Sequence, residues 1–253
     1  IVVTHPMGLS SAQQARLARF GEVTYHDTHP HPNEWVERCQ GFDIICSWIT
    51  GLREHYSQLH DVFISVPFVG VSSFLDSQIV ANNHLTISNS PGSNRHAVSE
   101  WITYMLLYAM RQIHPYINIT TPVSLPLPTS SVGLAGKNII ILGRCNIGSR
   151  VGDICQALGM HVTYFVRGDN LVDKVKDAEV VVDTLSSNPT SRGLLNQAFF
   201  ASLKKGAIFI SVTVGNIVDF DAMIAALDSG QLSFVAHDVM DIKPGDTTNP
   251  IYQ

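Results

Sequence analysis

Short apolar runs alternate with amphipathic segments along most of this chain. In the first part, apolar runs at 1–5, 22–27, 42–48, 62–70 and 85–90 predict strands, with helical patterns at 10–21 and 32–41 between them. A second series begins at 137, where runs at 137–143, 161–166, 179–185, 207–214 and 232–240 predict strands separated by helices at 148–159, 172–178, 193–206 and 220–230. Regular alternation of strand and helix predicts α/β architecture, with two parallel sheets covered by helices on both faces.

A longer helical pattern at 93–117 joins the two series. One face of it carries Val98, Ile102, Met105, Leu106 and Ala109. Trp101, Tyr104 and Tyr108 lie off that face, so this helix must bury more than one surface. The Pro-rich stretch at 120–131 lacks any period and predicts an exposed arm. We expect the helix and the arm to contact a second copy of the chain in a homodimer.

Composition and charge exclude several classes of partner. The net charge is -5 and there is no basic run, so we expect neither nucleic acid nor an acidic membrane surface as a partner. The four cysteines form no C-x-x-C pair and no signal peptide is visible, which predicts reduced thiols and a cytoplasmic location. His26, His29 and His31 are close in sequence, but the prolines among them favour a solvated loop over a metal site.

The stretch "IIILGRCNIGSRVGDICQALG" begins at Ile139 and has the order strand, turn, helix. Gly143 and Gly148 suit the tight turn and the close helix packing of a dinucleotide-binding turn, and Asn146 and Ile147 between them are candidate cofactor contacts. Cys145 stands where a glycine would let the backbone approach a pyrophosphate. A tight turn that binds no ligand is therefore the alternative interpretation.

The end of the next predicted strand bears on the choice of cofactor. An acidic residue there would bind the adenosine ribose, but this chain has Val166 followed by Arg167. Arg167 either receives a 2′-phosphate, which favours NADP over NAD, or is a solvated loop charge.

Four stretches, in order between Asn89 and Pro244, resemble the D-isomer-specific 2-hydroxyacid dehydrogenase family: "SNSPGSNRHAVSEW", "GLAGKNIIILGRCNIGSRVGDICQALGMHV", "TSRGLLNQAFFASLKKGAIFISVTVGNIVDFDAMIAALDSGQL" and "HDVMDIKP". The resemblance implies a flavodoxin-like substrate lobe at 1–94 and a Rossmann dinucleotide lobe at 95–253, with 95–113 as a hinge and dimer helix. It also implies NAD or NADP, and a small carboxylic acid as substrate. The substrate lobe is expected to lack the family's C-terminal return segment.

The family's catalytic set departs from its pattern in this sequence. The resemblance places an arginine for the substrate carboxylate at Val214, and the glutamate that pairs with the catalytic histidine at Lys243. The histidine itself belongs to a later "T-P-H" segment, beyond Gln253. Cofactor contacts fall by resemblance on Val212, Thr213, Val214 and Asp238.

Other side chains could rebuild the missing set. Arg95, His96 and Lys243 together could provide a carboxylate clamp and a proton donor, unless Arg95 and His96 simply begin a surface helix. Two hypotheses follow. The protein is either a working NAD(P)-dependent oxidoreductase for a 2-keto or 2-hydroxy acid with a rearranged active site, or an inactive family member that serves as a binding or regulatory protein.

Overall fold

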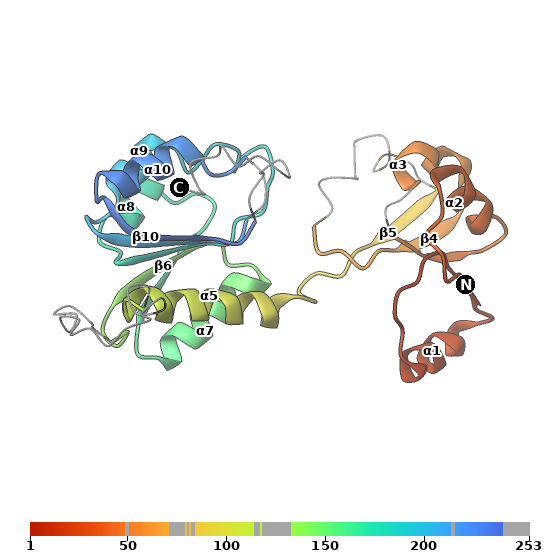
Figure 1. Cartoon of the computed structure of the whole chain (residues 1–253). Coiled ribbons are helices and arrows are strands. Elements are labelled where there is room, and N and C mark those ends of the chain that lie inside the picture. Colours follow the sequence, from red (N-terminus) through yellow and green to blue (C-terminus); the bar gives the residue numbers. More distant parts are fainter. Residues whose placement is uncertain are drawn as a thin grey trace. The chain divides into compact units, whose positions relative to one another are not determined.

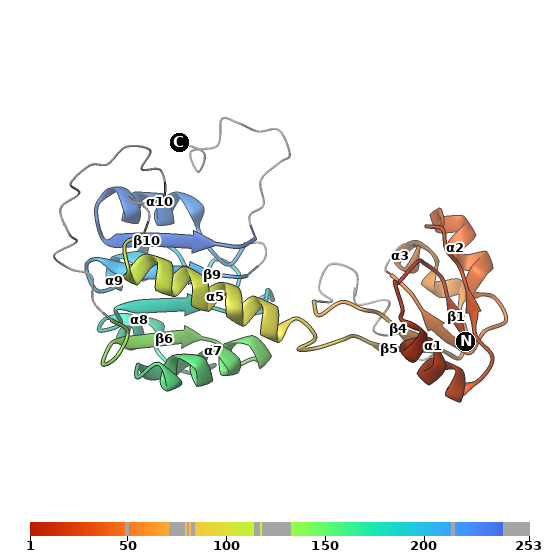
Figure 2. The same ribbon diagram turned by 60° about the horizontal axis from the view of Figure 1, so that its bottom comes forward.

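The computed structural model describes residues 1–48, 51–70, 79, 81, 84–113, 117, 133–213 and 216–239. They belong to two compact units, Ile1–Ser93 (unit 1) and Asn94–Gln253 (unit 2), shown in Figures 1 and 2. Each unit is built around its own five-stranded sheet. The predicted class, α/β with two doubly wound parallel-sheet lobes, is confirmed. The roles given to the lobes 1–94 and 95–253 stay predictions.

Unit 1 has a parallel sheet with the strand order β2-β1-β3-β4-β5. Its strands are β1 (Val2–Val3), β2 (Thr24–Tyr25), β3 (Ile44–Cys46), β4 (Val62–Ser65) and β5 (Leu85–Ser88), and its helical segments are α1 (Ser11–Leu17), η1 (Ala18–Phe20), α2 (Pro32–Cys39), α3 (Leu52–His55) and η2 (Tyr56–Gln58). Proline at the first position of α2 and Glu34 in its first turn favour the start of that helix. Trp35, Val36 and Cys39 then form its buried face.

Unit 2 has a parallel sheet with the order β10-β9-β8-β6-β7. Its strands are β6 (Asn138–Leu142), β7 (His161–Phe165), β8 (Val180–Asp183), β9 (Ala207–Ser211) and β10 (Leu232–His237), and its helices are α5 (Arg95–Met110), α7 (Asn146–Ala157), α8 (Leu171–Val175), α9 (Gln197–Ser202) and α10 (Phe220–Asp228). Helices α5 and α7 cover one face and α8, α9 and α10 the other (Figure 1). Ile139 and Ile141 pack toward the first layer and Ile140 toward the second.

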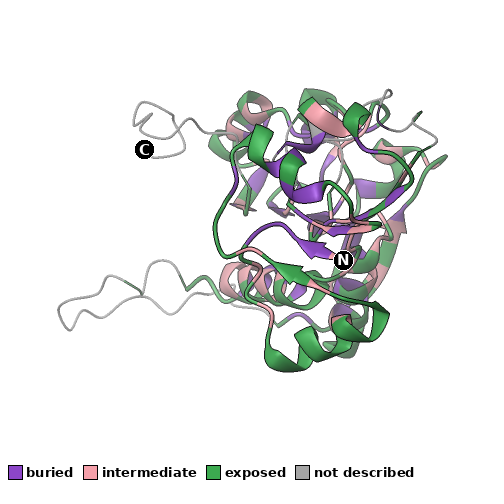
Figure 3. Ribbon diagram, turned by 90° about the vertical axis from the view of Figure 1, so that its right-hand side faces the viewer, coloured by how far each residue is buried: buried purple, intermediate pink, exposed green. Residues whose placement is uncertain are grey.

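The burial pattern explains why the inner strands β6, β8 and β9 are nearly continuous apolar runs. A parallel sheet covered on both faces has no solvated side, so each position of the strand must be apolar. In β6 the positions 139–142 are all 0% exposed, and buried residues follow the strands through the interior in Figure 3. In these three inner strands the polar residues, Asn138, Asp183 and Ser211, lie at the strand ends, where the sites described below are found.

The two sheets share one connection pattern. The first strand of each unit, β1 or β6, lies between the second and the third strands of that unit. The chain therefore leaves the first strand in one direction and later returns on its other side. This creates one switch point at the carboxyl ends of β1 and β3, and a second at the carboxyl ends of β6 and β8. Open α/β sheets bind ligands at such points.

Three predicted elements need correction. The helix predicted at 93–117 is described as α5, which ends at Met110. The helix predicted at 193–206 is only α9, because Leu195 forms a bridge with Val218 and Asn196 caps the helix after it. The strand predicted at 207–214 ends at Ser211. The predicted arm at 120–131 lies outside the described residues.

Candidate functional site

The turn from β6 to α7 lies at the switch point of unit 2 and needs glycine at two positions. Gly143 adopts φ 94°, in the left-handed region where side chains are disfavoured. A Cβ on Gly148 would lie 2.3 Å from the carbonyl oxygen of Gly143 and 2.7 Å from Oγ1 of Thr184. Helix α7 can therefore approach the end of β6 closely only with glycine at 148.

Cys145 has an ordinary backbone conformation, with φ -81° and ψ -176°, so this position does not require glycine. Its side chain caps α7, because Sγ accepts a hydrogen bond from the amide of Gly148 at 3.4 Å. The same thiol lies 3.5 Å from the carbonyl oxygen of Thr184, at the end of β8. Cys145 thus ties the two strands of the switch point together and uses one amide donor of the first helical turn.

A polar cavity of about 380 Å³ opens beside this turn and is lined by Arg95, His96, Arg144, Cys145, Asn146, Ser149, Arg150 and Asp153. Its guanidinium groups come from α5 (Arg95), from the turn (Arg144) and from α7 (Arg150). Arg95 Nε donates to His96 Nε2 at 3.3 Å, so the His96 proton is assigned to Nδ1. Arg144 lies 5.1 Å above the ring of Tyr164, which holds its guanidinium by a cation-π contact.

These groups fit the phosphates of a dinucleotide. The first amides of a helix lack intrahelical partners and attract anions, and at α7 those of Asn146 and Ile147 have no partner among the described residues. The arginines around the cavity add positive charge at the same place. The structure therefore brings Arg95 and His96, two predicted catalytic candidates, to the predicted cofactor turn.

The remaining predicted cofactor residues lie along the carboxyl edge of the same sheet. Val166 is 44% exposed, and its amide donates to Asp169 Oδ2 at 2.9 Å. Arg167 is exposed beside it. Val212 is half-buried and Thr213 is buried after β9, while Asp238 is exposed after β10. Val214 and Lys243 lie outside the described residues.

A buried acid at this edge was missed by the sequence analysis. Asp183, the last residue of β8, is 0% exposed. Its Oδ2 accepts hydrogen bonds from Thr213 Oγ1 at 2.7 Å and from Ser211 Oγ at 3.0 Å, and its Oδ1 accepts one from the amide of Leu185 at 3.1 Å. Burial raises the pKa of Asp183 to about 6, although these hydrogen bonds oppose the rise. An acid inside the run "VVVD" was the available signal.

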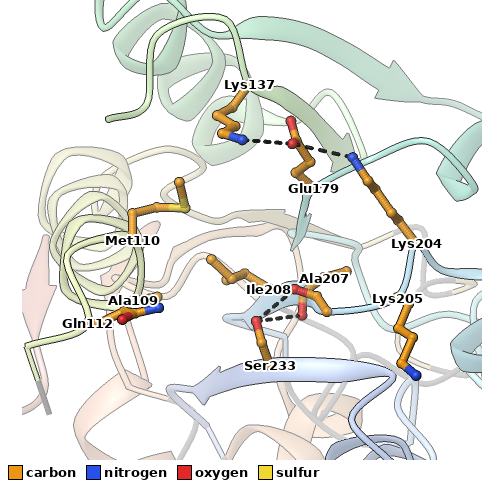
Figure 4. Close-up of a pocket in the computed structure, with 11 residues that line it drawn as sticks. Ala109, Met110, Gln112, Lys137, Glu179, Lys204, Lys205, Ala207, Ile208 and Ser233 are labelled. Carbon is orange, nitrogen blue, oxygen red and sulfur yellow. Dashed lines mark hydrogen bonds and ion pairs between the residues drawn. The ribbon is translucent and has the colours of Figure 1, made fainter. Parts of the chain in front are cut away.

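The opposite edge of the sheet carries an ion-pair cluster in a cavity of about 220 Å³ (Figure 4). Glu179 Oε1 lies 2.9 Å from Lys137 Nζ and 3.3 Å from Lys204 Nζ, and its Oε2 accepts from the amide of Asn138 at 3.0 Å. Partial burial alone would raise the pKa of Glu179, but these contacts outweigh it and lower the pKa to about 2. The cluster joins the segments that precede β6, β8 and β9, which is a structural role.

The described residues contain neither a cluster of metal-binding side chains nor a helix that could span a membrane. Among those residues, no His, Cys, Asp or Glu side chains gather in a group of three or more that could hold a metal ion. No helix within the same ranges is long and apolar enough to cross a membrane.

Comparisons with known proteins agree with the fold. D-3-phosphoglycerate dehydrogenase of Haemophilus influenzae is 32% identical over 174 residues, which cover 63% of this chain and 42% of that protein. Glyoxylate reductase of Aeropyrum pernix is 26% identical over 199 residues, covering 70% of this chain and 59% of the reductase. This chain therefore spans less than two thirds of the length of either relative.

Among solved structures, the apo form of D-mandelate dehydrogenase from Rhodotorula graminis aligns with a TM-score of 0.82 at 19% identity, over 96% of this chain and 82% of that one. At that identity the alignment shows a shared fold. The sequence match is more specific, since residues 103–253 fit the family described as "D-isomer specific 2-hydroxyacid dehydrogenase, NAD binding domain". The chain belongs to the D-isomer specific 2-hydroxyacid dehydrogenase family, and these residues correspond to the NAD-binding domain of that family.

Proposed function

We propose that this protein binds NAD(P) at the turn from β6 to α7 and acts on, or senses, a 2-hydroxy or 2-keto acid with an altered catalytic set. The polar cavity at that turn carries the proposal. Its arginines and the free amides of Asn146 and Ile147 supply donors for phosphate oxygens, and Gly148 keeps the helix close to the strand. Hydride exchange with C2 of the acid is the chemistry that a nicotinamide supplies when bound.

The groups at the end of β7 favour NADP over NAD. The carboxylate of Asp169 accepts a hydrogen bond from the amide of Val166 on Oδ2, which also lies 3.5 Å from Lys174 Nζ, so one of its two oxygens is already paired. The exposed Arg167 lies two residues before it and can pair with a 2′-phosphate. We expect NADPH to bind more tightly than NADH, and Arg167→Gln to reduce the difference.

Catalysis needs a cationic side chain that binds the carboxylate of the substrate, and a group that donates a proton to it. Among the described residues at the cavity, His96 carries a proton on Nδ1 and Arg95 lies beside it. This pair can orient an acid and exchange a proton with its hydroxyl oxygen. Val214 and Lys243, in place of the family's arginine and glutamate, favour the alternative that the protein binds its ligands without turnover.

A two-step experiment tests the proposal. Fluorescence titration with NADH and NADPH measures cofactor binding, and a screen of 2-keto acids then measures oxidation of the bound cofactor. Arg150→Gln should weaken binding about tenfold or more, because it removes a charge-assisted contact of about 1.5–3 kcal/mol. Lys176→Gln, a change on the exposed segment after α8, is the matched control and should leave affinity unchanged.

The outcomes separate the two hypotheses. If the protein binds the cofactor and turns over an acid, and if turnover falls in the His96→Gln variant, the result supports the working enzyme. Cofactor binding without turnover of any acid supports the binding or regulatory protein. No binding of either dinucleotide at millimolar concentration contradicts the proposal itself.

A further inference from the structure

The turn between β6 and α7 is joined directly to the end of the neighbouring strand β7. The amide of Gly143, the first residue after β6, donates to the carbonyl oxygen of Phe165, the last residue of β7, at 3.0 Å. Arg144 follows the first of these two residues, and Val166 and Arg167 follow the second. Neighbouring strands lie about 4.8 Å apart. Arg144 and the segment after β7 therefore start from adjacent points at the carboxyl edge of the sheet.

The ring of Tyr164, in β7, packs against a part of α7 that requires glycine. A Cβ on Gly152, in the second turn of α7, would lie 1.8 Å from Tyr164 Oη and 2.8 Å from its Cζ. Glycine inside a helix lowers the stability of that helix relative to alanine, and this close approach is a physical reason for it here. Partial burial raises the pKa of Tyr164, and the charge of Arg144 opposes the rise. The phenol is thus neutral and held against α7.

This ring in turn holds the guanidinium group of Arg144. The Cζ atom of Arg144 lies 5.1 Å from the centroid of the Tyr164 ring, which is within the range of a cation-π contact. In the part of the chain that the structure describes, no carboxylate forms an ion pair with Arg144 or with Arg167. Both arginines are exposed. Arg144 is therefore held beside β7 and is available to an anion.

The position of these two arginines suits one particular phosphate of a dinucleotide. In dinucleotide-binding folds the pyrophosphate lies at the first amides of the helix, whereas the adenosine ribose lies at the end of the next strand, which is β7 here. A phosphate on the 2′-oxygen of that ribose carries about 1.5–2 negative charges at pH 7 and three acceptor oxygens. Arginine binds such a group through pairs of parallel N–H donors.

We propose that Arg144 and Arg167 together bind the 2′-phosphate of NADPH, and that Tyr164 is a positioning residue that holds Arg144 for this contact. The choice of a dinucleotide as ligand rests on the proposed function, whereas the support of Arg144 by Tyr164 is a contact of the structure. Arg144 adds a second determinant of cofactor choice to Arg167. The sequence alone indicates only Arg167, because Arg144 and Tyr164 meet only through the fold.

The first measurement is the NADH dissociation constant divided by the NADPH dissociation constant, from nicotinamide fluorescence titrations of the whole chain. The unmodified protein should bind NADPH about 10- to 100-fold more tightly than NADH. Arg144→Gln should reduce this ratio about 3- to 10-fold, because it removes one of two guanidinium groups that only the 2′-phosphate contacts. Arg150→Gln is the matched control. Arg150 borders the cavity from α7, so this change should weaken binding of both dinucleotides by the same factor and leave the ratio unchanged.

Variants of Tyr164 separate positioning from a general effect on the fold. Tyr164→Leu should reduce the ratio about 2- to 5-fold, the value of an exposed cation-π contact, and should leave the affinity for NADH unchanged. Tyr164→Phe keeps the ring and should keep the ratio. In the Arg144→Gln protein, Tyr164→Leu should have no further effect on the ratio, because both residues act through one contact. If Tyr164→Leu does not fold, trifluorophenylalanine at this position keeps the shape of the ring, weakens its π-face, and should lower the ratio in the same way.

Fragments of the cofactor test the 2′-phosphate site apart from the proposed function. Adenosine 2′,5′-bisphosphate and adenosine 5′-monophosphate differ only in the 2′-phosphate, and neither contains nicotinamide. We expect the bisphosphate to bind about 10- to 100-fold more tightly, and Arg144→Gln to reduce this preference about 3- to 10-fold. If this preference is found and neither NADH nor NADPH binds, the proposed function fails and the 2′-phosphate site stands.

Several results would overturn the assignment of the 2′-phosphate site. One is equal affinity of the unmodified protein for NADH and NADPH. Another is an Arg144→Gln protein that keeps the ratio, whether its affinities are unchanged or both fall together, as they would if Arg144 contacted the pyrophosphate. A Tyr164→Leu protein with the unmodified ratio refutes the positioning role. In each of these cases measurable binding of NADH leaves the proposed function standing, whereas no binding of the bisphosphate or of either dinucleotide at millimolar concentration contradicts both.

Discussion

The buried carboxyl of Asp183 predicts an unusual pH dependence of stability in unit 2. Its pKa rises from the ordinary value of 3.8 to about 6 in the folded protein, because burial disfavours the charged form. One pKa unit is worth about 1.4 kcal/mol, so the rise corresponds to about 3 kcal/mol. The folded state binds the proton more tightly than the unfolded state. The contribution of Asp183 to the free energy of unfolding is therefore complete below pH 3.8 and is lost as the pH rises through about 6.

The measurement compares the unmodified protein with Asp183→Asn between pH 4 and pH 7. Other titrating groups cancel in the difference between the two proteins, because the partners of Asp183 are a backbone amide and two hydroxyl groups. The free energy of unfolding of the unmodified protein minus that of Asp183→Asn should fall by about 2–3 kcal/mol as the pH rises from 4 to 7. Denaturant unfolding followed by ¹⁹F NMR of 5-fluorotryptophan isolates unit 2, since Trp101 is the tryptophan of that unit and Trp35 and Trp48 belong to unit 1.

A second variant, at an exposed carboxyl of unit 2, is the control for Asp183→Asn. Asp177→Asn removes an exposed carboxyl from the same unit and is the control for the loss of one side-chain charge. If the difference in unfolding free energy between Asp183→Asn and the unmodified protein does not change between pH 4 and pH 7, Asp183 is ionised throughout that window. The assignment of a raised pKa would then be wrong, and the three hydrogen bonds to Asp183 would have to outweigh its burial.

Three further predictions concern other parts of the chain. Cys145→Gly should tighten dinucleotide binding several-fold, because it frees the amide of Gly148 and removes a Cβ from the turn; unchanged or weaker binding in a fluorescence titration would argue against phosphate binding at this turn. Glu179→Gln should lower the free energy of unfolding of unit 2 by about 1 kcal/mol at pH 7, a value reduced by solvent screening. In the unmodified protein this stabilisation is present above pH 4.5 and lost as the pH falls toward 2, which thermal unfolding at several pH values would detect, with no such loss in the variant. We also propose a homodimer through α5, where Tyr104 is 55% exposed and Leu107 is 41% exposed; Tyr104→Glu should then shift sedimentation toward monomer, and a monomeric unmodified protein would contradict the proposal.

The order of strands and helices could be predicted because it depends on local apolar patterns. The two glycines of the β6–α7 turn were also predictable, since a turn of this kind has fixed spacing. The contacts that shape the site were not predictable, because they join residues far apart in the chain. The Cys145 thiol meets Thr184, 39 residues later, and Asp183 meets Ser211 and Thr213, 28 and 30 residues later. No single-sequence pattern encodes such pairs.

The contacts of the Cys145 thiol show how the absence of a glycine at this position affects the donors of the turn. From the sequence, a Cβ at this position predicts interference with a phosphate. In the structure the side chain turns toward Thr184 and caps the helix, so its direct effect is to occupy the amide of Gly148. The amides of Asn146 and Ile147 stay available. The turn therefore has fewer donors than a glycine turn, and the arginines around the cavity compensate with charge.

The two units have the same switch-point topology, but different groups lie at the two switch points. In unit 2 the switch point holds helix amides and guanidinium groups, which suit phosphates. In unit 1 it holds the buried ring of His5, whose Nε2 has no hydrogen-bond partner among the described residues. The phosphate donors at the turn of unit 2 include neither Val214 nor Lys243, so the changes at those two positions leave these donors in place. Turnover is therefore the property that we expect to be most sensitive to the altered residues, and these side chains predict a protein that binds the cofactor but exchanges hydride slowly.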